Sequence, residues 1–387
     1  AAAVQQQQQG QALRAKGAEG GAEPPSNGAP PPPGGAGGPP EGQPQAAGAA
    51  PGAASSDYSN LQELSDALWG SNSPGRSSGV SASGKHREAA ATAAPPPKPA
   101  TPASAPASSA QQGRLLGLQC AGFSVPHPSK VEKGGEDAFF ASPVEADSAP
   151  LFLGAIGVAD GVGGWSEDGV DPAAYARTLM QNCELAASPP AALTPQEVMD
   201  DAHLLTELPG SATAVVAVLR ESGSLSVANL GDCGFRVVRG SGALVKSKPQ
   251  QHEFNMPFQL AWSKVLPDTD TAMDAQLYEL EVQEDDVLVF GSDGLFDNMW
   301  DEELTTIVQD FTRNTPKPYS NEDAAALAKK LAEKAAQNST TPEYRSPWSV
   351  AAANAGAVPL LSRLFPRGGK PDDTTVVVGF LEDMTPQ

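Results

Sequence analysis

The hydrophobic and polar positions divide the chain into two parts. Residues 1–112 contain mainly Ala, Pro, Gly, Ser and Gln, with few apolar residues at regular spacing. A segment of this composition buries too little apolar surface to offset the entropy of the chain. We therefore predict that residues 1–112 form a disordered, low-complexity tail and that residues 113–387 form one folded domain.

One short segment of the tail departs from this pattern. Residues 59–69 have apolar side chains at helical spacing, namely Leu61, Leu64, Leu68 and Trp69. The pattern predicts a short amphipathic helix that docks on a partner. The alternative is a transient helix, since an isolated helix of this length is marginal in water.

From residue 113 onward, short apolar runs predict β-strands. They span residues 151–159, 212–219, 225–230, 235–238, 287–290 and 374–381. The second and third runs flank a short polar turn, which predicts a hairpin. We expect Asp232 to be a tight-turn residue that holds a further hairpin.

Segments with helical periodicity lie between these groups of strands. They span residues 173–187, 196–208, 301–311 and 322–337. Strands grouped by short hairpins, with long helices between the groups, favour antiparallel sheets flanked by helices over an alternating parallel sheet.

The net charge of the chain limits the kinds of ligand that it is expected to bind. The formal net charge is −21, and residues 113–387 hold 39 acidic but only 19 basic residues. Nucleic acid and anionic lipid both require a basic surface, so neither is an expected ligand. The acidity is compatible with a site that collects cations. No apolar stretch is long enough to predict membrane insertion.

The three cysteines, Cys120, Cys183 and Cys233, include no CxxC pair. Such a sparse set does not form a disulfide framework. We expect them to be buried thiols in a reducing compartment.

Acidic motifs lie where four of the predicted strands begin or end. They are Glu136-Asp137, Asp160-Gly161, Asp293-Gly294 and Asp372-Asp373. Each Asp-Gly alone is a common turn dipeptide. As a set, carboxylates at strand ends can converge on one rim of a sheet, and Mg²⁺ and Mn²⁺ prefer such oxygen ligands. Glycine also lets the backbone approach closely, so that its carbonyl can serve as a ligand.

An ordered series of motifs resembles the metal-dependent (PPM, type 2C) protein phosphatases. The motifs are GGEDAFF (134–140), GVADGVGGW (157–165), GSATAVVAV (210–218), ANLGDCGFRVVR (228–239), FGSDGLFDNMW (290–300) and DDTTVVV (372–378). SVPHPSKVEKGGEDAFF (124–140), GVGGWSEDGVDP (161–172) and QQHEFNMPFQL (250–260) resemble the organellar branch, which is typified by the yeast Ptc-seven phosphatase and its plant relatives.

The resemblance implies a four-layer α-β-β-α sandwich of two antiparallel sheets with flanking helices. It also implies two Mg²⁺ or Mn²⁺ ions that activate a water to hydrolyse phosphoserine and phosphothreonine in protein substrates. Asp160 matches the ligand that bridges both ions, and the Gly161 carbonyl matches a ligand of one ion. Asp293 and Asp373 match ligands of the other ion, and Glu136 and Asp137 match acidic residues that reach the ions directly or through water.

Two positions depart from the family pattern. Val162 stands where many members have a histidine that protonates the leaving group, and Glu132 stands where many have an arginine that holds the phosphate. His127, Lys130 and Lys133 lie just upstream of the first acidic motif and are our candidates for phosphate binding. The alternative for each is a residue of an exposed loop.

Two hypotheses of function follow. The first is an active, monomeric serine/threonine phosphatase, and the second is a catalytically weak phosphatase fold that serves as a binding module. The retained carboxylates favour the first. The branch implies a chloroplast or mitochondrial location, and residues 1–18 contain two basic residues and no acid, as is typical of transit peptides.

Overall fold

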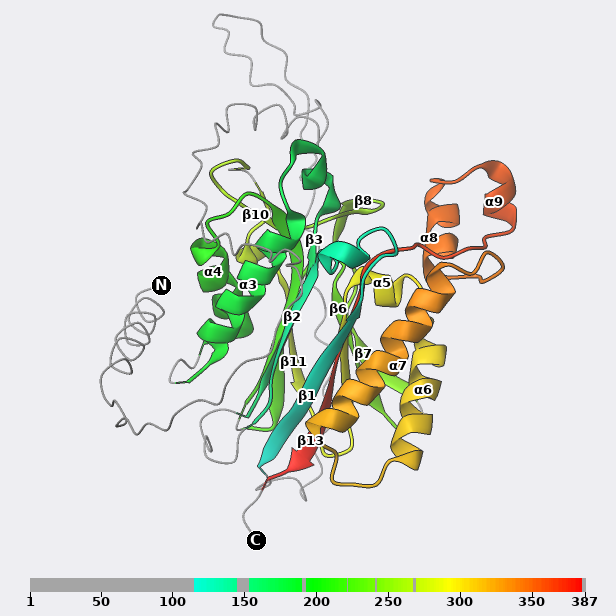
Figure 1. The fold of residues 1–387 in the computed structure, drawn as a ribbon. Coiled ribbons are helices and arrows are strands. Elements are labelled where there is room, and N and C mark those ends of the chain that lie inside the picture. Colours follow the sequence, from blue (N-terminus) through cyan, green and yellow to red (C-terminus); the bar gives the residue numbers. More distant parts are fainter. Residues whose placement is uncertain are drawn as a thin grey trace, which may run out of the picture.

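Figure 1 shows the fold of the protein as a computed structural model. The structure describes residues 115–144, 153–189, 193–220, 222–240, 242–266 and 269–384. The predicted tail at residues 1–112 and its helix at 59–69 lie outside these residues.

Two antiparallel sheets form the centre of the domain. The first has five strands in the order β1-β13-β12-β6-β7. They are β1 (Leu116–Val125), β13 (Thr374–Asp383), β12 (Val287–Gly291), β6 (Gly234–Arg239) and β7 (Gly242–Lys246).

The second sheet has six strands. Its order is β11-β5-β4-β3-β2, and the short strand β10 (Leu260–Ala261) pairs beside β4. The others are β11 (Gln276–Glu281), β5 (Ser224–Leu230), β4 (Ser211–Leu219), β3 (Ala155–Gly161) and β2 (Asp137–Ser142). Strands β8 (Gln251–Glu253) and β9 (Met256–Pro257) form a separate small hairpin.

Helices cover the outer face of each sheet. In Figure 1, α3 (Pro172–Ala187) and α4 (Pro195–Leu205) cover the second sheet, whereas α6 (Asp301–Asn314) and α7 (Asn321–Ser339) cover the first. This confirms the predicted α-β-β-α sandwich. The shorter helices are α5 (Asp293–Phe296), α8 (Pro347–Ala355) and α9 (Leu360–Leu364).

Local sequence explains where the long helices begin. The Asp171 carboxylate accepts a hydrogen bond from the Ala173 amide ahead of α3. Thr194 with Glu197 and Ser320 with Asp323 form capping boxes at the starts of α4 and α7. Each cap satisfies amide groups that have no partner within the helix.

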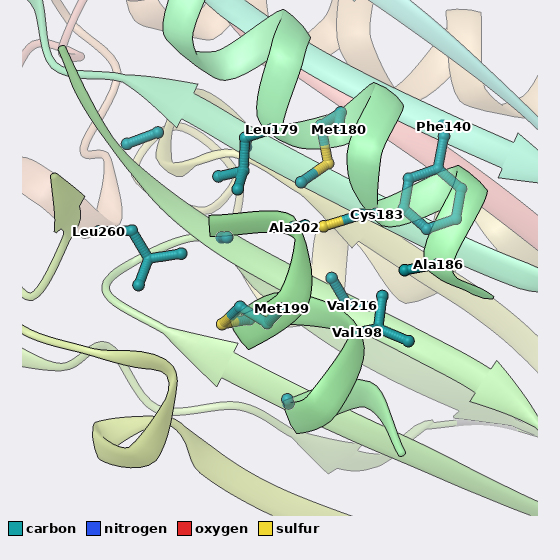
Figure 2. Close-up of a cluster of buried hydrophobic side chains, with 14 of the residues drawn as sticks. Phe140, Leu179, Met180, Cys183, Ala186, Val198, Met199, Ala202, Val216 and Leu260 are labelled. Atoms are coloured by element: carbon teal, nitrogen blue, oxygen red, sulfur yellow. The ribbon is translucent and has the colours of Figure 1, made fainter. Parts of the chain in front are cut away.

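Apolar side chains fill the space between the sheets. This inter-sheet core includes Leu118, Ile156, Val158, Val215, Phe235, Leu288, Phe290 and Val377. The rings of Phe235 and Phe290 stack with their centroids 5.5 Å apart. A second cluster joins the second sheet to α3 and α4. Figure 2 shows Phe140, Leu179, Met180, Cys183, Met199 and Val216 in that cluster.

Three local predictions need correction. Strand β3 begins at Ala155 rather than at residue 151, because Gly154 has a φ of 122° that breaks the extended backbone. Helix α4 ends at Leu205, and there the Thr206 hydroxyl donates to the Ala202 carbonyl. The turn at Asp232 does not join a hairpin. Strand β5 belongs to the second sheet and β6 to the first, so this link crosses between the sheets.

All three cysteines are buried, as expected, and none forms a disulfide. Burial raises the pKa of each thiol, which leaves the three side chains as neutral groups. Among the described helices, none combines the length and the apolar composition needed to cross a bilayer.

The inter-sheet core makes a first prediction. Ile156 is fully buried, so Ile156→Ala leaves a cavity and should lower the free energy of unfolding by about 2–4 kcal/mol. Leu361→Ala is the control, because Leu361 is 72% exposed and its loss should cost no more than about 0.5 kcal/mol. Urea unfolding measures both, and equal losses would contradict the assignment of Ile156 to the core.

Candidate metal centre

The acidic motifs meet at one end of the two sheets. Asp137 begins β2, Asp160 lies near the end of β3, and these strands are neighbours in the second sheet. Asp293 follows β12 and Asp373 precedes β13, which are neighbours in the first sheet. Antiparallel pairing therefore brings residues far apart in sequence to one rim.

Asp137 and Asp160 face each other directly across β2 and β3. Like charges in this position repel, and burial strengthens the repulsion. Asp137 is buried; the Ser292 hydroxyl donates to its Oδ2 at 2.7 Å, while its Oδ1 has no hydrogen-bond partner. An unpartnered, buried carboxylate oxygen is costly unless a cation approaches it.

Gly161 lies where two backbone segments come close. A Cβ atom at this position would stand 2.7 Å from the Pro172 carbonyl oxygen and 2.8 Å from the Glu136 carbonyl oxygen. Only glycine fits here without moving the backbone. The residue is therefore required by packing, whatever its carbonyl binds.

Asp293 lies at the first turn of α5, where the helix dipole favours a carboxylate. It is buried, and its Oδ1 has no hydrogen-bond partner. The next residue, Gly294, lies so close to the Asp373 carbonyl oxygen that any Cβ would collide with it. This contact fixes Asp293 against the segment that precedes β13.

The two aspartates before β13 have different surroundings. Asp373 is buried; its Oδ1 accepts from the His127 amide at 2.6 Å, and its Oδ2 accepts from the Glu136 amide at 2.8 Å. Asp372 is half-buried, and its charge raises the pKa of Asp160. Asp373 thus ties down the loop before β2. Asp372 accepts from the Asp373 amide at 3.0 Å through Oδ1, and its Oδ2 stands 3.3 Å from the Lys370 Nζ, so both carboxylates lie close to the acidic centre.

The three candidates for phosphate binding lie on the loop before β2. The Lys130 Nζ stands 2.6 Å from Glu136 Oε2 and 3.1 Å from Asp373 Oδ2. The His127 ring bonds to Ser129 on its own loop. Lys130 and Lys133 line a cavity of about 140 Å³ together with Glu136.

The two positions that depart from the family pattern lie outside the ring of carboxylates. Val162 packs against the apolar cluster around Trp165, and Glu132 is exposed. Neither position supplies a proton donor or a cation to the centre.

Sequence reasoning missed Lys370 and gave Asp232 only a turn role. The Lys370 Nζ forms ion pairs with Asp293, Asp297 and Asp372. Asp232 lies at the link between the sheets, and its pKa is raised by burial and by the charge of Asp293. The signal was available in part: Lys370 directly precedes the last acidic motif, and Asp297 lies one helical turn after Asp293.

Burial and mutual repulsion disfavour the charged carboxylates. Burial, followed by neighbouring aspartates, raises the pKa of Asp137 to about 7, of Asp232 to about 7 and of Asp297 to about 8. The same causes raise the pKa of Asp160 well above its ordinary value and also raise that of Asp372. The site therefore favours any positive charge that enters it.

The donor set fits Mg²⁺ or Mn²⁺. In the part of the chain that the structure describes, no group of three or more His, Cys, Asp or Glu side chains is already gathered around one metal position. Mg²⁺ keeps several waters and takes only a few carboxylates. The unpartnered oxygens of Asp137 and Asp293 are suited to this mode of binding.

Comparison with known proteins places the chain among phosphatases. It is 40% identical over 268 residues to "Probable protein phosphatase 2C 26" of Arabidopsis thaliana, which covers 68% of this chain and 83% of that protein. It is 38% identical over 244 residues to the human "Protein phosphatase PTC7 homolog", covering 59% of this chain and 76% of that protein. No protein-family model matches the chain.

A solved structure supports the same likeness. The X-ray structure of the photosystem II phosphatase PBCP has 35% sequence identity and a TM-score of 0.60, and the match covers 69% of this chain and 99% of that one. The two-sheet architecture is therefore shared with a phosphatase of known structure.

The raised pKa values predict how stability depends on pH. Unfolded aspartates titrate near pH 4, so between pH 8 and 6 the folded chain takes up protons that the unfolded chain does not. The destabilisation is present in full above the folded pKa and is relieved as the pH falls through it. Acidification from about pH 8.5 to pH 6 in EDTA should therefore raise the free energy of unfolding, by roughly 1 kcal/mol per pH unit.

Saturating Mn²⁺ should reverse this trend, because protons compete with the cation for the same carboxylates. Chemical unfolding at several pH values, with EDTA or with Mn²⁺, measures both slopes. Asp137→Asn is the matched variant and should flatten the slope in EDTA. A stability that falls steadily on acidification in EDTA would contradict the assignment.

Proposed function

Because the chain belongs to the protein phosphatase 2C family, we propose that its residues 113–387 hydrolyse phosphoserine and phosphothreonine in proteins with the help of two divalent cations, Mg²⁺ or Mn²⁺. The observation that carries this proposal is the direct opposition of the buried Asp137 and the partly exposed Asp160, with further carboxylates nearby. Such an arrangement is unfavourable by itself and becomes favourable when cations bind.

We assign the ligand roles as the family resemblance implies. Asp160 and the Gly161 carbonyl would hold the cations, and Asp293 and Asp373 would supply further ligands. Glu136 and Asp137 contribute directly or through water. Asp373 accepts from two backbone amides and Asp372 from one, which supports Asp372 as sharing the ligand role that the resemblance gives to Asp373.

The bound cations would supply an activated water and positive charge for the phosphoryl oxygens. Other residues of the chain hold the carboxylates in position. Ser292 donates to Asp137 and accepts from the Thr375 amide at 3.1 Å, so one hydroxyl fixes the carboxylate of one sheet to the backbone of the other. Rigid ligands of this kind reduce the reorganisation needed during reaction.

Lys130 and Lys133 are the residues we propose for the substrate phosphate. They line the cavity beside Glu136, and Lys130 keeps part of its side chain exposed. An ammonium at this position can orient a phosphate as a point charge. His127 supports the loop through its backbone amide and is the remaining candidate to contact phosphate.

The alternative is a binding module that keeps the fold without turnover. It would be favoured by loss of the carboxylates, and each predicted carboxylate is retained at the rim. We propose phosphorylated proteins as the partners, a monomeric state, and a chloroplast or mitochondrial location. The likeness to a photosystem II phosphatase favours the chloroplast.

Asp160→Asn tests the proposed function. The change removes the charge of the bridging ligand and should lower Mn²⁺-dependent release of phosphate from phosphothreonine peptides by about 10³-fold or more. Asp310→Asn is the control, because Asp310 is an exposed residue of α6 and should keep full activity. The proposal is wrong if the wild-type protein shows no metal-stimulated turnover on phosphopeptides or para-nitrophenyl phosphate.

Asp372→Asn and Asp373→Asn distinguish the two neighbouring aspartates. Asp372→Asn should weaken Mn²⁺ binding by about tenfold or more, with little effect on stability in EDTA. Asp373→Asn turns an amide NH₂ group toward a backbone donor and should cost about 1–3 kcal/mol of stability, with a smaller effect on Mn²⁺ affinity. Calorimetric Mn²⁺ titration and thermal unfolding measure both. The reverse pattern would make Asp373 the ligand.

A further inference from the structure

Helix α9 carries an exposed apolar surface. In Figure 1, α8 and α9 form a hairpin that projects from the sandwich. Four of its apolar side chains are between 65% and 73% exposed, namely Leu360, Leu361, Leu364 and Phe365. They form two pairs spaced four residues apart, so they gather on one side of the helix. We call these four side chains the α9 surface. Monomeric proteins rarely leave such a group uncovered unless it binds something.

Hydrogen bonds within the hairpin fix the position of the α9 surface. The Arg363 guanidinium donates to the Val358 carbonyl at 2.8 Å and also to the Gly356 carbonyl, which fixes the turn between α8 and α9. The Gly368 amide donates to the Tyr344 carbonyl at 2.7 Å and closes the base of the hairpin. The exposure of the apolar side chains is therefore a property of an ordered hairpin.

The charge of the hairpin is opposite to that of the domain. Residues 344–369 contain no acidic residue and three basic ones, Arg345, Arg363 and Arg367, whereas residues 113–387 hold 39 acidic and 19 basic residues. All three arginines are exposed, and none of them pairs with a carboxylate of the described residues. An apolar surface bordered by positive charge suits an acidic amphipathic ligand.

The chain itself contains a segment with the complementary properties. Residues 59–69 are predicted to form a short amphipathic helix with four apolar side chains at helical spacing, which are Leu61, Leu64, Leu68 and Trp69. The same segment contains two acidic residues, Glu63 and Asp66, and no basic residue. A helix of this length is marginal in water, so it gains stability when its apolar face is covered.

The connection between this segment and the domain is long enough for the two to meet. Leu116 pairs with Asp383, so the tail joins the sheets at the end of β13 that lies farther from α9. Strand β13 has ten residues and spans about 33 Å. Residues 70–114 are 45 residues, and an unstructured chain of this length has an end-to-end distance of about 35–40 Å. Such a connection keeps the effective concentration of the segment near the millimolar range, so a weak contact is sufficient.

We propose that residues 59–69 dock as a helix on the α9 surface of the same chain. The leucines of the segment cover the α9 surface, and its acidic residues lie beside Arg363 and Arg367. The tail is thereby fastened to the α8–α9 hairpin, at the other end of the sheets from its attachment. None of these residues is a ligand of the proposed metal centre, so the inference stands independently of the proposed function.

Hydrogen exchange of the full chain, followed by mass spectrometry, tests the docking. Leu64→Asp with Leu68→Asp disrupts the apolar face of the segment. The α9 amides, including that of Arg363, which donates to the Pro359 carbonyl, should then exchange about tenfold faster. Gln43→Asp with Gln45→Asp is the matched control, because it adds the same two charges outside the segment and should leave this exchange unchanged. These changes lie in the tail, so none of them removes a side chain from the domain.

Charge reversal gives a second measurement. Glu63→Lys with Asp66→Lys places like charges beside the arginines and should accelerate exchange at α9 by about two- to fivefold. Adding Arg367→Glu to this variant should restore part of the protection. If the added change restores none, the predicted position of the segment beside Arg367 is wrong.

The proposal is overturned if α9 exchanges equally in the wild type and in Leu64→Asp with Leu68→Asp. Equal exchange together with binding of the wild type to vesicles that contain phosphatidylglycerol would assign the α9 surface to a membrane. Protection that grows with protein concentration, together with a dimer in sedimentation velocity, would assign it to a second copy. Either assignment also overturns docking within one chain.

Discussion

The repulsion between Asp137 and Asp160 is the constraint on which the rest of the site depends. The two carboxylates face each other across neighbouring strands, and the burial of Asp137 limits how far water screens their charges. The fold offsets part of this cost with the Ser292 hydroxyl and with lysines at the rim. It leaves carboxylate oxygens of Asp137 and Asp293 unpartnered, so the remaining cost favours external cations. The proposed function would therefore couple activity to stability, because the arrangement that would take up the cations destabilises the chain without them.

The two-sheet architecture offsets the destabilisation that this repulsion causes. A wide apolar core between the sheets, including Ile156 and Phe290, stabilises the strands over most of their length. The carboxylates that repel one another then lie at one rim of the two sheets. The bonds that cross between the sheets, from Ser292 to Asp137 and from the Glu136 amide to Asp373, lie at that rim and hold the two groups of ligands in register. A rigid scaffold with its electrostatic strain confined to one end is what a preorganised site requires.

The sequence predicted the central strands and long helices because their apolar runs are continuous and their caps are explicit, as at Thr194 and Ser320. It also located the acidic motifs, since aspartates beside buried strands are conspicuous. It could not show that β5 and β6 belong to different sheets. A turn at Asp232 has the same sequence pattern whether the strands on either side of it pair with each other or join different sheets. The resemblance gave the ligand role to Asp373 rather than to Asp372, but the sequence could not show which way the backbone turns each of these adjacent carboxylates. Lys370 was missed for a similar reason. Its ion pairs depend on the Asn298 side chain, which hydrogen-bonds to the amide and the carbonyl of Lys370 only in the folded chain.

The two lysines of the site illustrate how surroundings divide the work between identical side chains. Lys130 comes from a loop, is partly exposed and borders the cavity beside Glu136, and its ammonium pairs there with Glu136 and Asp373. The backbone of Lys370 is held by a hydrogen bond from its amide to the Asn298 side chain, and three carboxylates surround its ammonium. Moving this ammonium would leave buried charge uncompensated. Each ammonium has three carboxylates within 4.0 Å, so the two lysines differ in exposure, 27% against 19%, and in how firmly their backbone is held, rather than in the number of anionic partners.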